Sequence, residues 1–126
     1  MSLTCCHILL SVSDIDEAVD FYLTKLGLIL IESYPKFFAV RAGDVRFSVF
    51  LGGKKRDSGN EEGAPAVVML RTEDLDAKIA ELKGRGVVFE GDVMEAPKFM
   101  RYISLLDPDG NQLYVAQYLG DPFVAS

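Results

Sequence analysis

The sequence contains a single histidine, His7, in the stretch "CCHILLSV" near its start. An imidazole serves proteins as a metal ligand, as a general base near neutral pH, or as a satisfied member of a core. Cys5 lies two residues before His7, so on an extended strand the two side chains share a face and a thiolate could join a metal site there. The stretch alone does not decide whether His7 is a metal ligand, a catalytic base or a packed residue of a sheet.

Few other motifs carry chemistry. The sequence has no phosphate-binding glycine loop, no nucleophile elbow and no CxxC motif. Asp14 and Asp74 each precede a run of apolar residues with helical spacing, and we interpret them as helix caps and not as catalytic groups.

Composition excludes several classes of function. A chain of 126 residues that is 49% hydrophobic suits one ordinary core, so we expect a single domain over residues 1–126. The net charge of -6, without a basic stripe, argues against nucleic acid as a partner. No apolar run is long enough to cross a membrane, and the first residues do not resemble a signal peptide. Cys5 and Cys6 are adjacent and should face opposite ways, which fits a reducing cytoplasm better than a disulfide framework.

The chain repeats itself at an offset of about 60 residues. "SDID" at residues 13–16 matches "EDLD" at residues 73–76, and each is followed by apolar residues at the i, i+4, i+7 spacing of an amphipathic helix. The first predicted helix stops near Gly27 and the second near Gly84 or Gly86.

Each predicted helix is preceded by one strand-like run and followed by three. The predicted strands are His7 to Val12, Leu28 to Ser33, Phe37 to Arg41, Val45 to Leu51, Ala66 to Arg71, Val87 to Val93, Arg101 to Leu106 and Gln112 to Gln117. The prediction is therefore an α+β fold of two β-α-β-β-β modules, at about residues 5–51 and 66–118, joined by a polar linker over residues 52–65.

This order and two of its segments resemble the vicinal oxygen chelate superfamily of glyoxalases, bleomycin resistance proteins and extradiol dioxygenases. The segments are "HILLSVSDIDEAVDFYLTKLGL" near the start and "DPDGNQLYVAQ" near the end. The resemblance implies that the modules form a cupped, partly open eight-stranded mixed sheet with helices on the outside. It also implies a homodimer, in which the modules pair either within one chain or across a two-fold interface.

The resemblance implies four metal-ligand positions, one on the first and one on the last strand of each module. They hold His7, Phe47, Val67 and Tyr114 here. Valine and phenylalanine have no donor atom, and a divalent ion needs three or four donors that also balance its charge. We therefore expect no metal and no cofactor, unless Cys5 or a partner chain completes the set.

The period of two in a strand extends this list along the inward face. The resulting wall is apolar and aromatic with a few polar groups, and it is expected to contact a ligand through His7, Phe47, Val67, Met69, Tyr102, Ser104, Gln112 and Tyr114. Leu9, Val49 and Ala116 share the same predicted face. His7 and Tyr114 are also the candidates for polarising a carbonyl or hydroxyl in catalysis.

Three functions fit these residues. The preferred one is metal-independent binding or sequestration of a small apolar or aromatic molecule. The alternative is a metal-dependent lyase or dioxygenase of the same superfamily with an unconventional site. The third is a structural module whose interior is filled by its own side chains.

Overall fold

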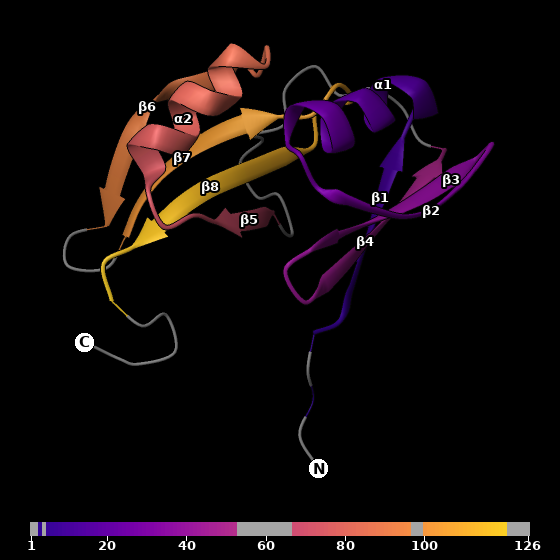
Figure 1. Ribbon diagram of the computed structural model, residues 1–126, viewed down its shortest axis with the longest axis horizontal. Helices are drawn as coiled ribbons and strands as arrows, with labels where there is room; N and C mark the ends of the chain where they lie inside the picture. The colour runs from indigo at the N-terminus through magenta and orange to yellow at the C-terminus, as the bar shows by residue number, and fades with distance from the viewer. Residues whose placement is uncertain (1–2, 4, 53–66, 97–99, 121–126) are drawn as a thin grey trace. The chain divides into compact units, whose positions relative to one another are not determined.

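The structure is a computed structural model that describes residues 3, 5–52, 67–96 and 100–120 (Figure 1). The chain divides into two compact units, Met1–Arg56 (unit 1) and Asp57–Ser126 (unit 2). Each unit holds a four-stranded mixed sheet, so the predicted α+β fold with two β-α-β-β-β modules is confirmed. The predicted linker, residues 52–65, lies outside the described residues except for Gly52.

Unit 1 begins with a strand and a helix and then adds three antiparallel strands. Its elements are β1 (His7–Val12), α1 (Ile15–Val19), the π-helical turns η1 (Asp20–Lys25), β2 (Ile29–Tyr34), β3 (Phe37–Ala42) and β4 (Val45–Leu51). The strand order is β1-β4-β3-β2, with β1 parallel to β4. β3 is antiparallel to both β2 and β4, so β2 runs parallel to β4 and to β1. Two parallel strands cannot be joined by a tight hairpin, so the chain crosses over between β1 and β2, here through α1 and η1.

The helix of unit 1 starts at a carboxylate cap and buries its aromatic residues against the sheet. The Asp14 side chain accepts a hydrogen bond from the Glu17 amide at 3.1 Å, as an N-cap residue does. Tyr22 of η1 is fully buried, and its ring centre lies 6.4 Å from that of Phe38 on β3. The face of the sheet that bears Phe38 is therefore the one that the helix covers.

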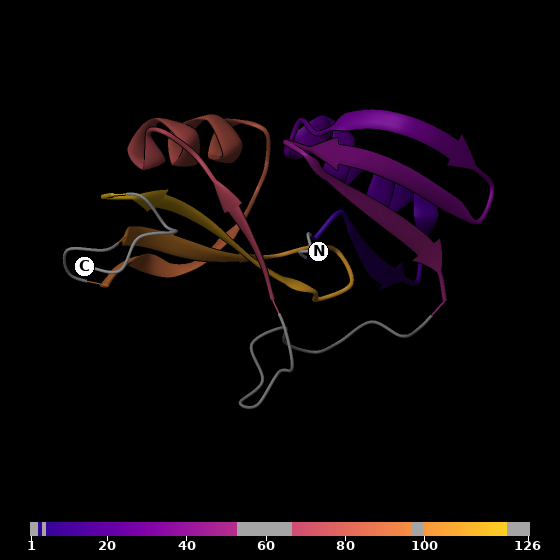
Figure 2. The same ribbon diagram turned by 90° about the horizontal axis from the view of Figure 1, so that it is seen from below.

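Unit 2 repeats the same order. Its elements are β5 (Val68–Arg71), α2 (Leu75–Gly84), β6 (Phe89–Ala96), β7 (Met100–Leu106) and β8 (Gln112–Tyr118). The strand order is β5-β8-β7-β6, with β5 parallel to β8, and α2 covers one face of this sheet (Figure 2).

Helix α2 is held to its sheet by polar contacts as well as by buried leucines. The Leu75 amide donates to the Gln117 side chain of β8 at 2.9 Å, and Arg101 of β7 forms an ion pair with Asp76 at 3.2 Å. The hydrogen bond to Asp76 and its negative charge raise the pKa of Arg101 above its usual value. The face of the sheet that bears Arg101 and Gln117 is therefore the one that α2 covers.

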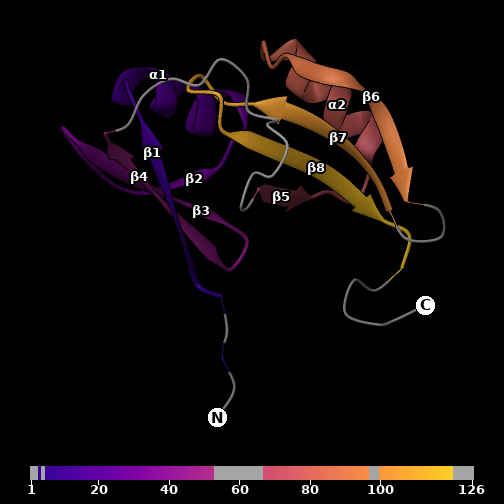
Figure 3. The same cartoon turned by 180° about the vertical axis from the view of Figure 1, so that it is seen from behind.

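The two long hairpins close with different turns. β3 and β4 are joined by only two residues, Gly43 and Asp44, with Gly43 in the left-handed region at φ 60°. β7 and β8 lie side by side (Figure 3) and are joined by residues 107–111. The buried Asp107 carboxylate accepts hydrogen bonds from the Asp109 amide at 2.9 Å and from the Asn111 amide and side chain, both at 2.8 Å. The Asp107 side chain alone thus accepts three hydrogen bonds that hold the second turn together.

None of the helices in the described parts of the chain has the length and apolar character needed to cross a membrane.

Candidate functional site

The strand register of unit 1 assigns each side chain to one of two faces. Residues paired directly across neighbouring strands point to the same side of a sheet. His7 pairs with Arg46, and Leu9 pairs with Ser48, so these four side chains share one face. Phe38, which contacts the helix, pairs with Val49 on the other face. We call the face that turns away from a unit's own helix its distal face, and His7 lies on the distal face of unit 1.

A connected polar cluster surrounds His7 on this distal face. Ser48 Oγ lies 2.5 Å from His7 Nε2 and accepts a hydrogen bond from Arg46 Nε at 3.2 Å. Arg46 Nη2 in turn donates to Glu32 Oε1 of β2 at 2.7 Å. His7 is exposed, whereas Ser48 is only 1% exposed. The cluster therefore crosses the sheet from β1 to β2 with its hydroxyl enclosed and its imidazole accessible.

Three aromatic rings form a row on the same face. Phe37 stacks on Tyr34 with ring centres 5.6 Å apart and on Phe50 with ring centres 5.1 Å apart. Phe50 pairs with Phe37 and with Ser11, so the row continues the distal face beyond Ser48. Tyr34 and Phe50 are both exposed. Unit 1 thus presents apolar rings beside hydrogen-bonding groups.

Phe47 does not share a face with His7, contrary to the expectation from the sequence. It pairs with Ile8 and Val40 and is 2% exposed, on the side that the helix covers. Val49 follows it to the same side. Ser48 and Arg46 take the distal positions of β4 instead, and neither was predicted as a site residue.

The distal face of unit 2 brings together four of the predicted residues. Tyr102, Ser104, Gln112 and Tyr114 lie on one side of the β7–β8 pair, as their register requires. Gln112 Nε2 donates to Ser104 Oγ at 3.0 Å and to the Tyr114 hydroxyl at 3.2 Å. The Tyr102 and Tyr114 rings meet edge to face with centres 5.4 Å apart. Ala116, also expected on this face, pairs with Tyr102.

Strand β5 adds apolar and cationic groups to this face. Met69 pairs with Tyr114, and its sulfur accepts a hydrogen bond from the Tyr118 hydroxyl at 3.5 Å. The Arg71 guanidinium lies 5.7 Å from the centre of the Tyr118 ring, within the range of a cation–π contact. Val67 precedes β5 and is exposed.

Glu90 is a site residue that the sequence pattern did not indicate. It pairs with Ser104 and accepts a hydrogen bond from the Ser104 hydroxyl at 3.2 Å. The register of β6 shifts between Glu90 and Met94, next to Gly91 at φ 72°. Such a bulge breaks the alternation from which faces are read in a sequence.

The donor atoms near His7 do not fit a divalent metal. Its hydrogen-bonded neighbours on the distal face are a hydroxyl and a guanidinium, and a guanidinium has no lone pair to offer a metal. The carboxylate of the cluster, Glu32, is already paired with Arg46 at 2.7 Å. No group of three or more His, Cys, Asp or Glu side chains within the described ranges is arranged to hold an ion. In unit 2, Met69 and Tyr114 supply a thioether and a phenol, which are poor ligands for such an ion.

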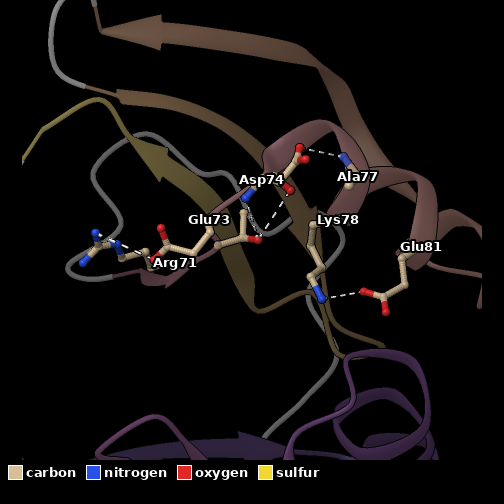
Figure 4. Close-up of a pocket in the computed structure, with 7 residues that line it drawn as sticks. Arg71, Glu73, Asp74, Ala77, Lys78 and Glu81 are labelled. Atoms are coloured by element: carbon tan, nitrogen blue, oxygen red, sulfur yellow. Dashed lines mark hydrogen bonds and ion pairs between the residues drawn. The ribbon is translucent and has the colours of Figure 1, made fainter.

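A separate hollow of about 570 Å³ lies at the start of α2 (Figure 4). The Asp74 carboxylate caps the Ala77 amide at 3.1 Å, and Lys78 pairs with Glu81 at 2.5 Å. The hydrogen bond from Lys78, together with its charge, holds the pKa of Glu81 below its usual value. These side chains are exposed or half-buried and bind one another, so the hollow has the character of a solvated helix surface.

Comparison with known proteins identifies the family. Residues 5–115 match the family model described as Glyoxalase/Bleomycin resistance protein/Dioxygenase superfamily. The chain belongs to this superfamily. The search of curated proteins gave no match.

Solved structures of the superfamily share the fold over nearly the whole chain. A glyoxalase/bleomycin resistance protein/dioxygenase from Alicyclobacillus acidocaldarius is 25% identical, with a TM-score of 0.79 over 97% of this chain and 96% of the other. A protein of the same description from Nocardioides is 20% identical, with a TM-score of 0.77 over 100% and 91% of the two chains. Lactoylglutathione lyase from Agrobacterium tumefaciens is 18% identical, with a TM-score of 0.71 over 93% and 95%.

Proposed function

We propose that this member of the glyoxalase/bleomycin resistance protein/dioxygenase superfamily binds a small aromatic molecule without a metal ion, on the distal faces of its sheets. The observation that carries the proposal is the composition of the distal face of unit 2. There, Gln112 is only 6% exposed and joins the Ser104 hydroxyl to the Tyr114 phenol beside the paired rings of Tyr102 and Tyr114. Apolar walls with a few converging polar groups are typical of sites for organic ligands.

Unit 1 supports the same proposal with different residues. Its distal face places the row of Tyr34, Phe37 and Phe50 beside the cluster around His7. Aromatic rings favour planar ligands through stacking, and the cluster offers both donors and acceptors. Because a guanidinium takes the place where a cation would need carboxylates, the proposed binding does not depend on metal.

Titration with small naphthalene derivatives, followed by two-dimensional amide NMR, tests this function. We expect saturable shifts of amide signals in β7 and β8 for 2-naphthol and 2-naphthoate, and weaker binding after Tyr114→Ala. Lys78→Met is the matched control, since Lys78 lies on α2, which covers the opposite face of this sheet, and the change should leave both titrations unchanged. Absence of saturable shifts for every aromatic probe would instead favour a structural module with filled faces.

We also propose that the protein is a cytoplasmic homodimer. β2 is an edge strand of its sheet, and it exposes three consecutive apolar residues, Ile29, Leu30 and Ile31. An uncovered apolar edge strand invites aggregation, and pairing with a second copy would remove that liability. The proposed location in the cytoplasm is supported by the two cysteines, which are free and exposed.

A further inference from the structure

The hydrogen-bond pattern around Ser48 determines which nitrogen of His7 carries its proton. A serine hydroxyl has one proton to donate and two lone pairs that accept. Arg46 Nε has only a proton to offer, so Ser48 Oγ is the acceptor of that 3.2 Å contact. The proton of the Ser48 hydroxyl then needs an acceptor of its own.

His7 Nε2 is the acceptor that the structure supplies. It lies 2.5 Å from Ser48 Oγ, and Ser48 is only 1% exposed, which leaves its hydroxyl little access to water. If Nε2 carried the proton instead, the Ser48 oxygen would accept hydrogen bonds from both Arg46 and His7. The buried proton of the Ser48 hydroxyl would then no longer have His7 as its acceptor. An enclosed donor without a partner is costly, so the arrangement with Ser48 donating is favoured.

We propose that Ser48 holds His7 as the Nδ1–H tautomer, so that the distal face of unit 1 offers a fixed N–H donor to a carboxylate or carbonyl oxygen of an aromatic ligand. Ser48 is a positioning residue in this proposal, because it acts through His7. The tautomer follows from the cluster alone, whereas the ligand class rests on the proposed small-molecule function.

The position of the aromatic row indicates the size of such a ligand. Ser48 and Phe50 are two residues apart on β4 and share the distal face, a separation of about 7 Å along the strand. The contact with Ser48 Oγ brings the imidazole of His7 next to Ser48, so a ligand whose oxygen meets that imidazole needs one or two rings to extend toward Phe50. His7 is exposed, and among the described residues its Nδ1 has no hydrogen-bond partner that competes with a ligand.

The single histidine makes the tautomer directly measurable. In a two-dimensional spectrum that correlates ring nitrogens with ring hydrogens, recorded at alkaline pH where imidazole is neutral, all histidine signals come from His7. The nitrogen that carries the proton resonates far upfield of the other, so the pattern distinguishes the two forms. We expect the Nδ1–H pattern in the folded protein and its loss on unfolding in urea, where the Nε2–H form predominates as in free histidine.

Variants of Ser48 separate positioning from general structure. Ser48→Thr keeps the hydroxyl and should keep the Nδ1–H pattern, whereas Ser48→Ala should shift His7 toward the Nε2–H form. Ser104→Ala is the matched control, because it removes a serine hydroxyl from the distal face of unit 2 and should leave the His7 spectrum unchanged. An Nε2–H pattern in the wild-type protein, or the same pattern in wild type and Ser48→Ala, would overturn the proposal.

Two naphthalene probes of opposite charge test the ligand class. We expect 2-naphthoate to shift the Nδ1 signal and to bind Ser48→Ala about tenfold more weakly, the loss expected for a hydrogen bond to a charged group. We expect 2-naphthylmethylamine, which offers donors only, to leave Nδ1 unchanged. If 2-naphthoate binds and shifts only signals of unit 2, the ligand class proposed for His7 is wrong while the binding function stands. If neither probe binds, the binding function fails together with the ligand class, and the tautomer alone is judged by the first spectrum.

Discussion

Two phenylalanines three residues apart on β4 should respond very differently to truncation. Phe47 is 2% exposed on the helix side of the sheet, whereas Phe50 is 41% exposed on the distal face. Replacing a buried phenylalanine with alanine costs about 3 to 5 kcal/mol, because it removes the transfer free energy of the ring and leaves a cavity. For a chain of this length that corresponds to a melting temperature lower by roughly 12 to 20 °C.

Phe50→Ala should lower the free energy of unfolding less than Phe47→Ala does, and it should weaken ligand binding more. The ring is partly in water already, and its main loss is the stack on Phe37 at 5.1 Å, so we expect about 1 to 2 kcal/mol. Urea unfolding followed by circular dichroism gives both free energies of unfolding, and titration with 2-naphthoate gives the change in affinity. Phe47→Leu, which keeps much of the buried volume, should lie between wild type and Phe47→Ala in stability.

A reversed order would refute this assignment of faces. If Phe50→Ala lost more stability than Phe47→Ala, or if Phe47→Ala stayed stable and bound 2-naphthoate poorly, then Phe47 would face the ligand after all.

The other predictions concern the second distal face, helix α2, the assembly and metal. Tyr114→Ala should weaken the binding of aromatic probes more than it lowers the free energy of unfolding, because the Tyr114 ring is only partly buried; denaturation and titration of one sample measure both. The pKa of Glu81 is held below its usual value, so the stability from its pair with Lys78 is present above the usual pKa and is lost as the pH falls through the lowered one. A carbon-detected NMR titration should show that lowered midpoint, and Lys78→Met should move it back up. Light scattering at micromolar concentration should give twice the chain mass of 13.9 kDa, and the monomer mass alone would contradict the dimer. Elemental analysis of protein purified without chelators should find no stoichiometric transition metal, and about one ion per chain that is lost on His7→Ala would restore the metal-dependent alternative.

Local signals in the sequence were sufficient for most of the fold. The acidic caps, the two helical repeats and the turn glycines predicted every strand and helix to within a few residues, because each is set by interactions close in the chain. In unit 2 the predicted side of the β7–β8 pair was also correct. Tyr102 and Ser104 were counted back from Asp107 on the pattern that the resemblance implies, and Gln112 follows from Tyr114 by the period of two.

The face of β4 could not be obtained in the same way. Phe47 was placed by counting four residues from Gly43, as Tyr114 lies four residues from Gly110. Both glycines lie two residues before their strand, so both counts end on its third residue. The first residue of β4 faces the helix, however, whereas the first residue of β8 lies on the distal face. The segment "RFSVF" did carry a usable signal, because the polar Arg46 and Ser48 alternate with the apolar Phe47 and Val49. That period of two places Phe47 and Val49 on the buried face, and only Phe50 departs from it.

The difference between the two turns also predicts a difference in how often the two hairpins open locally. The buried Asp107 carboxylate accepts hydrogen bonds from three donors of the β7–β8 turn, whereas the side-chain contacts of the β3–β4 turn are exposed to water: Arg41 donates to the Gly43 carbonyl at 2.6 Å and pairs with Asp44 at 3.4 Å. Backbone amides exchange with solvent deuterium only when their local structure opens, so a better-anchored turn slows exchange in the hairpin it closes. Amides at the turn end of β7 and β8 should thus keep their hydrogens longer than those at the turn end of β3 and β4. The duplicated architecture would then contain a slow-exchanging and a fast-exchanging copy of the same hairpin.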